Sequence, residues 1–276
     1  MLVNLNEVLK PAQKRGYAVG LFNTTDSDML EAAIEAAEEE RSPIIVGTAE
    51  VLLPYGELSL IAPGIIAAAK RATVPVVVHF DHGLSFDRCM EALKLGFSSV
   101  MFDGSLGKPE ENIAATREVV RIAHAMGATV EAEIGHVGNV GVTGDADRYT
   151  TVEEAVNFAD ATGIDALAIA IGTAHGAYKT KPKLDLERLS EIRAALDVPL
   201  VLHGGSGLSD NDFRDTIKRG IAKVNIFTDL CLAGTRAMAE GFEAGEDYLT
   251  IRNHKMSVIK EEVIKKIRLF GSCGKA

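Results

Sequence analysis

The feature that most constrains the fold is a repeated alternation of a short apolar strand with an amphipathic helix. Stretches such as "SDMLEAAIEAAEEE" and "EENIAATREVVRIAHAMG" carry apolar residues at helical spacing. Between such stretches lie segments with the composition of buried strands, at 17–22, 43–47, 74–80, 98–102, 129–134, 166–170, 198–203 and 223–227. Parallel strands need a crossover of roughly a dozen residues or more, so this order predicts a parallel sheet.

Eight such units predict an α/β protein whose strands close into a single (β/α)₈ barrel, a TIM barrel. A doubly wound open sheet is the alternative. The chain has 276 residues, a length at which such barrels form one unit, and no change of composition marks a boundary. We therefore expect one domain over 1–276, with "MSVIKEEVIKKIRLF" near the end predicting a C-terminal helical extension.

Charge and cysteine content narrow the classes of partner. A net charge of -10 disfavours a nucleic acid or an anionic membrane surface as partner, because both require clustered Lys and Arg. Cys89, Cys231 and Cys273 form no CxxC motif, so we expect reduced thiols. The stretch "MLVNLNEVLKPAQKRG" does not have the pattern of a signal peptide, and no apolar run reaches membrane-spanning length. These observations predict a cytoplasmic protein.

Histidines gather where the predicted strands end. His79, His82, His175 and His203 lie at or just past the C-terminal end of a strand, which is where barrel active sites are built. Three imidazoles from three strands, with one open position, form a typical catalytic zinc site. Each histidine alone is better explained as a polar cap on the barrel rim, but three beside glycines favour a metal centre.

Two glycine- and hydroxyl-containing segments follow the last two strands. "GGSG" contributes Gly204, Gly205 and Ser206, and "NIFTD" contributes Thr228. Barrels commonly hold a phosphate after these strands, on exposed backbone N–H groups and a helix start. The alternative is a flexible turn in which Ser209 caps the next helix.

Seven segments together resemble the class II, zinc-dependent ketose-bisphosphate aldolases, a family that includes fructose- and tagatose-bisphosphate enzymes. They are "AVGLFN", "VHFDHG", "VEAEIGHVG", "AIAIGTAHGAY", "LVLHGGSGL", "KVNIFTDL" and "KIRLFGSCGKA". The resemblance implies a barrel that reversibly cleaves a ketose 1-phosphate or 1,6-bisphosphate, in carbohydrate metabolism, into dihydroxyacetone phosphate and an aldehyde. It also implies one catalytic Zn²⁺ per subunit, a possible monovalent cation and a homodimer or homotetramer.

The resemblance also implies roles for individual residues. It makes His82, His175 and His203 the zinc ligands and Asp81 the acid/base at the oxygen of the aldehyde product. The alternative for Asp81 is to orient a zinc histidine. Glu133 matches an acidic residue that is either an alternative ligand or a neighbour of the ligands. The expected substrate contacts are Asn23, Gly176, Gly204, Gly205, Ser206, Asn225, Ile226, Phe227 and Thr228.

The chain departs from the family pattern at two places. The loop "GHVGNVGVTGDADRYT" lacks the usual acidic residues, and its nearest carboxylates are Asp145 and Asp147. "AGEDYLTIRNHK" lacks the Asp-Pro-Arg that meets a distal phosphate, and Arg252 is the nearest candidate. This second departure favours an aldehyde that is unphosphorylated or a sugar-derived acid.

Two other functions remain compatible with these residues. One is a zinc barrel of another class, an epimerase or hydrolase acting on a sugar phosphate. The other is a non-catalytic relative that binds a metabolite, which the altered loop would permit. A complete histidine triad beside Asp81 argues against the second.

Overall fold

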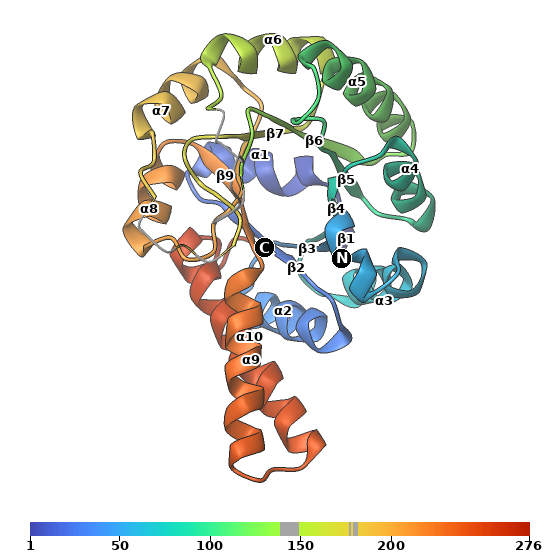
Figure 1. The fold of residues 1–276 in the computed structure, drawn as a ribbon, viewed down its shortest axis with the longest axis vertical. Helices are drawn as coiled ribbons and strands as arrows, with labels where there is room; N and C mark the ends of the chain where they lie inside the picture. Colours follow the sequence, from blue (N-terminus) through green and yellow to red (C-terminus); the bar gives the residue numbers. More distant parts are fainter. Residues whose placement is uncertain (139–148, 177, 179–181) are drawn as a thin grey trace.

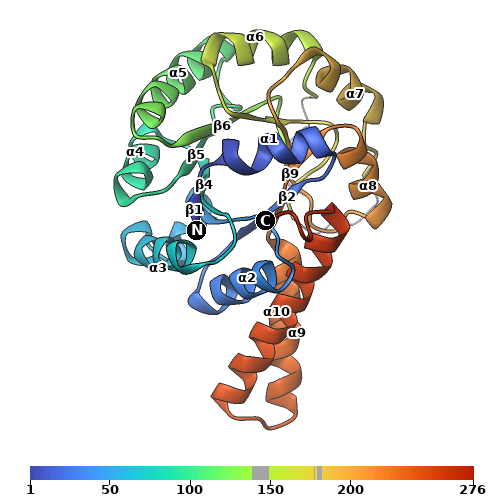
Figure 2. The ribbon, with the colours of Figure 1, turned by 180° about the vertical axis from the view of Figure 1, so that it is seen from behind.

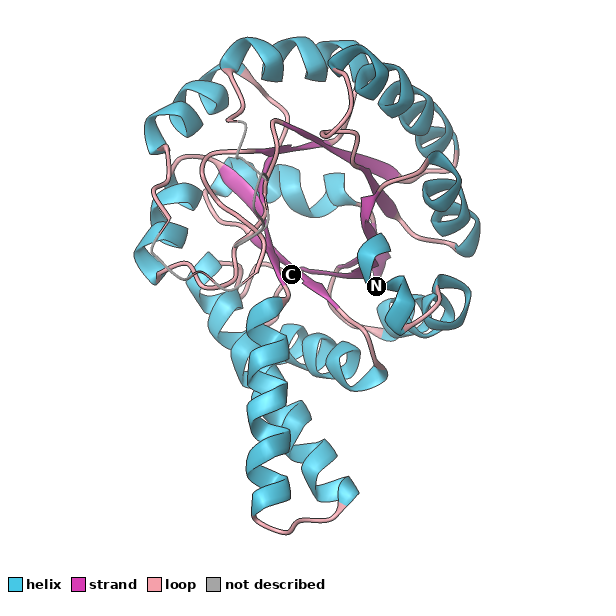
Figure 3. Ribbon diagram, viewed as in Figure 1, coloured by secondary structure: helices cyan, strands magenta, loops and turns pink. Residues whose placement is uncertain are grey.

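The computed structural model describes residues 1–138, 149–176, 178 and 182–276. Its parallel strands follow the order β4-β3-β2-β9-β8-β7-β6-β5, and a further pairing of β4 with β5 closes the ring (Figure 1, Figure 3). The strands of the ring are β2 (Val19–Asn23), β3 (Ile44–Ala49), β4 (Val76–Gly83), β5 (Ser99–Phe102), β6 (Thr129–Ile134), β7 (Ala166–Ile169), β8 (Leu200–Leu202) and β9 (Ile221–Ile226). The predicted (β/α)₈ barrel is confirmed, and the open sheet is excluded.

One short strand was not expected from the sequence. β1 (Leu2–Val3) pairs with the first residues of β4, Val76 and Val77, and its two residues are too few to show any periodicity. The helices are α1 (Leu5–Arg15), α2 (Ser27–Glu39), α3 (Leu58–Arg71), α4 (Phe86–Leu95), α5 (Pro109–Ala125), α6 (Val152–Thr162), α7 (Leu186–Ala195), α8 (Asp210–Lys218), α9 (Thr228–Glu243) and α10 (Tyr248–Phe270), with a 3₁₀ helix η1 (Glu50–Tyr55).

Local sequence signals set where these helices begin and end. At α6, the Thr151 hydroxyl accepts the backbone N–H of Glu154, and the Glu154 carboxylate accepts the backbone N–H of Thr151. Gly163 ends the helix with a φ of 72°, a value that favours glycine. The ends of α6 are thus set by residues of its own segment.

The hydrophobic core has two layers. One lies between the outer faces of the strands and the surrounding helices. The other fills the inside of the barrel, where Leu5 and Leu9 of α1 pack with Leu21, Val77 and Val201. Figure 2 shows α1 lying across this end of the barrel. The apolar plug closes one end, so polar side chains can converge only at the opposite end.

The C-terminal extension is a hairpin of α9 and α10 that projects from the barrel (Figure 1). α10 packs along α2, and Lys255 forms ion pairs with Asp26 and Asp28 at the start of α2. The helical extension predicted from the sequence is confirmed, although α10 begins earlier than the segment that suggested it. The three cysteines are free, as expected. Among the described residues, none of the helices combines the length and hydropathy needed to cross a membrane.

Candidate metal centre and substrate cavity

The β4 strand ends in an unusual backbone conformation that turns a histidine toward the mouth of the barrel. His82 has a φ of 45°, uncommon for a residue with a side chain, and it lies just after Asp81. Gly83 follows in a crowded position, because an added Cβ would lie 2.5 Å from Cys89 Sγ and 2.6 Å from the Met101 carbonyl oxygen. The backbone therefore leaves regular strand geometry at His82, and both Asp81 and His82 line the same cavity.

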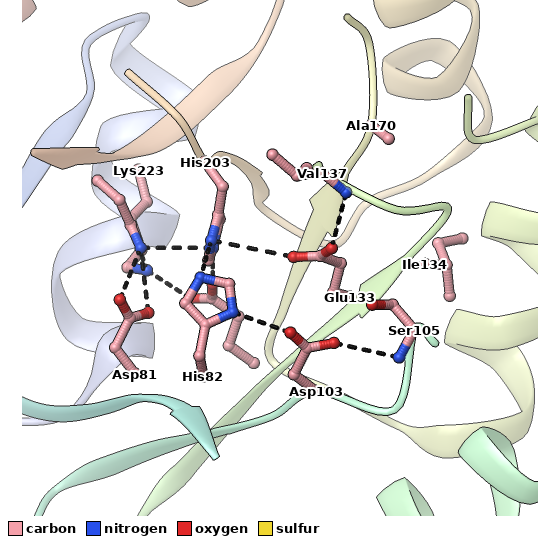
Figure 4. A network of polar contacts seen from close by, with 12 residues as sticks. Asp81, His82, Asp103, Ser105, Glu133, Ile134, Val137, Ala170, His203 and Lys223 are labelled. Carbon is pink, nitrogen blue, oxygen red and sulfur yellow. Dashed lines mark hydrogen bonds and ion pairs between the residues drawn. The ribbon is translucent and has the colours of Figure 1, made fainter. Parts of the chain in front are cut away.

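Three histidine rings meet at this mouth. The ring centroid of His82 lies 4.5 Å from that of His203 and 5.0 Å from that of His175. His82 Nε2 and His203 Nδ1 are 2.8 Å apart (Figure 4). One nitrogen from each of the three rings lies within 4.8 Å of the others, so the three residues could hold one metal ion.

Carboxylates fix the orientation of two of these rings. Asp103 Oδ2 lies 2.9 Å from His82 Nδ1, and Asp103 is itself held by the backbone N–H of Ser105 at 3.1 Å (Figure 4). Glu131 Oε1 lies 2.8 Å from His203 Nε2. Such contacts direct the opposite ring nitrogen toward a metal and are typical of metal-binding histidines.

The protonation of the rings follows from their surroundings. Burial, with the neighbouring His82 and His203, lowers the pKa of His175 to about 3, so its ring is neutral. Burial also lowers the pKa of His203. For His82, burial acts downward, but Asp81 and Asp103 raise the pKa to about 10. In the absence of a metal, the His82 ring therefore carries a proton that a bound cation would displace.

Glu133 places a carboxylate beside the histidines. Its Oε1 accepts the backbone N–H of Val137 at 3.2 Å, and its Oε2 lies 3.9 Å from His203 Nδ1 (Figure 4). That buried Oε2 makes no hydrogen bond within the described part of the chain. Burial and the nearby Asp103 raise the pKa of Glu133 to about 8. With His82 and Asp103 it forms a second group close enough to bind a metal.

A third group of possible ligands lies deeper in the barrel. His79, Asp81 and Glu131 are fully or almost fully buried and close together. Lys223 Nζ, however, already lies 2.8 Å from Glu131 Oε2, so the side chain of Lys223 occupies the place that a metal ion would take beside this carboxylate. His79 Nδ1 is 2.8 Å from the Ser99 hydroxyl, and burial lowers the pKa of His79 to about 4. His79 thus packs as a neutral histidine beneath the site.

Asp81 is held by two amide groups. Its carboxylate accepts hydrogen bonds from Asn23 Nδ2 at 2.8 Å and from Asn225 Nδ2 at 3.0 and 3.2 Å. Burial would raise the pKa of Asp81, but His82 and Lys223 outweigh it and lower the pKa below its ordinary value. Asp81 is therefore an ionised carboxylate in a fixed orientation at the edge of the cavity.

The predicted phosphate segments also reach this cavity. The Ser206 hydroxyl oxygen accepts the backbone N–H groups of Phe227 and Asp229 at 3.3 Å each, at the start of α9. Because the oxygen accepts both bonds, the Ser206 O–H remains able to donate to a ligand. Backbone N–H groups, a helix start and a hydroxyl donor together are typical of an anion site.

The glycines between β8 and α8 are required by close packing. Gly204 has a φ of 65°, and an added Cβ would lie 2.5 Å from the Ala174 carbonyl oxygen. At Gly205 an added Cβ would lie 2.9 Å from the Asn225 carbonyl oxygen. Ser209 caps α8 by accepting a backbone N–H, as the alternative for this segment predicted. The segment therefore combines a helix cap with a wall of the cavity.

The cavity at the mouth has a volume of about 430 Å³. The predicted site residues that line it are Asn23, Asp81, His82, Glu133, His175, Gly176, Gly204, Gly205, Ser206, Asn225, Phe227 and Thr228. His203 is fully buried beneath the lining, and the side chain of Ile226 packs into the hydrophobic core. Asp145 and Asp147, the carboxylates expected to replace the usual loop base, lie outside the described residues.

Much of the cavity lining is apolar. Its large apolar side chains include Val51, Leu52, Leu84, Leu106 and Phe227. Among the described residues that line the cavity there is no Lys or Arg. Arg252, the sequence-based candidate for a distal phosphate, forms an ion pair with Asp28 at 2.7 Å and is not part of the lining.

Sequence reasoning assigned no role to three residues that shape the site. They are Asp103, Glu131 and Lys223. Asp103 contacts His82 and lines the cavity. Glu131 contacts His203, Lys223 contacts Glu131, and neither Glu131 nor Lys223 lines the cavity. A signal existed for two of them, because Glu131 and Lys223 precede Glu133 and Asn225 by two residues and share their strand face. A charged residue at that position of a buried strand indicates a polar barrel interior.

Comparison with known proteins identifies the family of this chain. The family model "Fructose-bisphosphate aldolase class-II" matches residues 3–275. The chain is 40% identical to a "Probable fructose-bisphosphate aldolase" of Bacillus subtilis, covering 100% of this chain and 99% of the relative. It is 41% identical to a "6-phospho-5-dehydro-2-deoxy-D-gluconate aldolase" of Bacillus licheniformis, covering 99% and 96%.

A solved structure extends the likeness to the fold. The crystal structure of the YdjI aldolase from Escherichia coli K12 superposes with a TM-score of 0.92 at 38% identity, covering 100% of both chains. Proteins with this level of sequence identity over their whole length belong to one family. This chain therefore belongs to the class II fructose-bisphosphate aldolase family and is an aldolase.

Proposed function

We propose that the protein is a zinc-dependent aldolase that cleaves a ketose phosphate into dihydroxyacetone phosphate and an aldehyde. The observation that carries the proposal is the convergence of His82, His175 and His203 beside an ionised Asp81 in one cavity. Family membership supports the reaction class. The identity of the metal and of the substrate rests on the chemistry of these side chains.

The donor set fits zinc. Three imidazole nitrogens are ligands that Zn²⁺ prefers, and three protein ligands leave a position for substrate. The Oε2 of Glu133, which makes no hydrogen bond to the residues that the structure describes, supplies a further oxygen donor or a partner for a ligand. Zinc bound by these residues would supply Lewis-acid stabilisation of the negative charge that develops on the ketone half of the substrate.

Asp81 is suited to move the proton at the other end of the bond. In cleavage, its carboxylate accepts the proton of the hydroxyl group on the carbon that becomes the aldehyde. The electrons of the broken carbon–carbon bond pass to the carbon beside the ketone. The low pKa of Asp81 keeps it ionised before substrate arrives, and Asn23 and Asn225 hold it in place.

The phosphate of the ketone half is expected at the start of α9. Ser206 and Thr228 offer hydroxyl groups there, and Gly204 and Gly205 keep side chains out of the space beside them. A monovalent cation near this phosphate, a homodimer or homotetramer, and a cytoplasmic location stay predictions from the sequence. Sedimentation of the purified protein measures the second of these.

The aldehyde half is expected to lack a phosphate. Much of the described lining is apolar, and it offers no Lys or Arg to a second phosphate. The two relatives named above do not indicate the substrate of this chain. Their names give different aldolase reactions, yet they are almost equally similar to this chain, at 40% and 41% identity. The lining therefore carries this part of the proposal.

A product assay tests the reaction. Purified, zinc-loaded protein is incubated with a panel of ketose 1-phosphates and bisphosphates, and dihydroxyacetone phosphate is detected by coupled reduction. We expect its release with at least one substrate, together with an aldehyde. Release of inorganic phosphate alone would indicate a hydrolase, and an isomeric sugar phosphate alone would indicate an epimerase. Binding with no turnover of any panel member would indicate a metabolite-binding relative.

A second comparison tests the acceptor. We expect kcat/KM for a ketose 1-phosphate to exceed that for the matching 1,6-bisphosphate by about tenfold or more, since an unpaired buried phosphate costs at least about 1.4 kcal/mol. The synthesis direction is also measured, with dihydroxyacetone phosphate and equal concentrations of plain, carboxylated and phosphorylated aldehydes. A clear preference for fructose or tagatose 1,6-bisphosphate would contradict the unphosphorylated acceptor while leaving the aldolase reaction intact.

A further inference from the structure

A lysine lies inside the barrel, beneath the candidate metal centre. Lys223, on β9, has no exposed surface, although lysine is almost never fully buried unless it is paired. A buried ammonium is unfavourable unless it is paired and hydrogen-bonded. Lys223 Nζ lies 2.8 Å from Glu131 Oε2 and donates a hydrogen bond to Asn225 Oδ1 at 2.8 Å. Each partner in turn contacts a functional residue of the site: Glu131 contacts His203, and Asn225 contacts Asp81.

The first contact leads to a metal ligand. Glu131 bridges Lys223 through Oε2 and His203 through Oε1, at 2.8 Å each. The carboxylate is therefore fixed from both sides, and its contact with His203 Nε2 leaves Nδ1 facing His82. Without the ammonium, the buried carboxylate would lose its cation and could turn away from the ring.

The second contact leads to Asp81. An asparagine side chain can present either its oxygen or its NH₂ group to a neighbour. Because Lys223 can only donate, Asn225 turns its oxygen to Lys223 and its NH₂ group to both oxygens of Asp81. Without the ammonium the amide could reverse, and its oxygen would then face the carboxylate.

We propose that Lys223 is a positioning residue that orients the metal ligand His203 through Glu131 and the proton-transferring Asp81 through Asn225. The inference rests on the proposed zinc aldolase function. One buried cation thus aligns the two halves of the site, which come from strands far apart in the sequence. The competing explanation is that Lys223 only fills the barrel interior and stabilises the fold.

The test uses Lys223→Met, which keeps an unbranched side chain only one atom shorter and removes its charge. We expect zinc affinity, measured by competition with a chromophoric chelator, to fall about 10- to 100-fold, as when other partners of metal-binding histidines are lost. We also expect the visible spectrum of the Co²⁺-substituted protein to change. At saturating zinc, kcat should stay at least about tenfold low with KM little changed, because Asn225 still fails to hold Asp81.

Lys255→Met is the matched control, since Lys255 also loses ion pairs but lies between α10 and α2. It should lower the melting temperature and leave zinc affinity and kcat unchanged. If Lys223→Met behaves like this control, with zinc affinity and zinc-saturated kcat within about twofold of the parent, the positioning role is overturned.

A double variant separates the two contacts and covers a failure of Lys223→Met to fold. Lys223→Met/Glu131→Gln has no unpaired buried charge and keeps an oxygen for His203. We expect it to fold and recover most of the zinc affinity, while kcat at saturating zinc stays low. Full recovery of kcat would overturn the link through Asn225, and zinc affinity as weak as in a folded Lys223→Met would overturn the link through Glu131. Zinc and cobalt binding can be read even if no aldolase activity is found, so failure of the proposed function is distinguishable from failure of this inference.

Discussion

Replacing His82 by alanine should remove zinc binding and aldolase turnover together. His82 Nε2 faces His203 Nδ1 at 2.8 Å, so the substitution deletes one of three converging nitrogens. The loss of zinc affinity should exceed the about 10- to 100-fold that follows loss of a residue behind a ligand. Metal content by mass spectrometry and release of dihydroxyacetone phosphate measure the two effects.

Two further variants separate the role of the His82 side chain from the effects of backbone strain and of losing a neighbouring histidine. His82→Gly relieves the φ of 45° and should lose zinc equally, which separates ligation from backbone strain. His79→Ala removes a fully buried histidine whose ring contacts Ser99, and it should cost stability while retaining most zinc affinity. If His79→Ala lost as much zinc as His82→Ala, the assignment of the ligand would be reversed.

Asp81→Asn should abolish most turnover without emptying the metal site. The variant keeps the shape of the side chain but cannot accept a proton at neutral pH. General acid–base catalysis typically contributes about 10²- to 10⁴-fold, so kcat should fall by that amount with KM within a few-fold. Steady-state kinetics at saturating zinc, with zinc content measured on the same sample, give both values.

Asp103→Asn is the control for Asp81→Asn, because Asp103 orients His82. This control should weaken zinc binding, and excess zinc should restore most of its turnover. Asp81→Asn should not respond to excess zinc. If it did respond in the same way, Asp81 would only orient a ligand, which is the alternative that the sequence left open.

The barrel could be predicted from sequence because its signals are local. Each strand of the ring carries its own apolar run, and helices such as α6 carry their own periodicity and caps, as at Thr151 and Gly163. The elements that escaped prediction include α1, which precedes the first predicted strand, and β1 and η1. β1 has two residues and η1 has six, which are too few to show a period.

The site was predictable only in part. Strand ends identified the three histidines and Asp81, but not the direction of the His82 ring, which depends on a backbone that leaves the strand region. Strict alternation would have turned His82 away from Asp81. The supporting contacts join residues 72 and 144 positions apart, as in Glu131 with His203 and Asp81 with Asn225. Only closure of the barrel brings such residues together.

The plug formed by α1 has a consequence for how such a protein can diversify. The apolar plug lies at the α1 end, while the aliphatic rim of Val51, Leu84 and Leu106 lines the cavity at the other end. Those three side chains are 60%, 52% and 80% exposed, so exchanging them removes little buried surface. Substitutions at this rim can therefore change the shape of the cavity with little loss of stability, so the catalytic mouth and the scaffold of the barrel can vary separately during evolution.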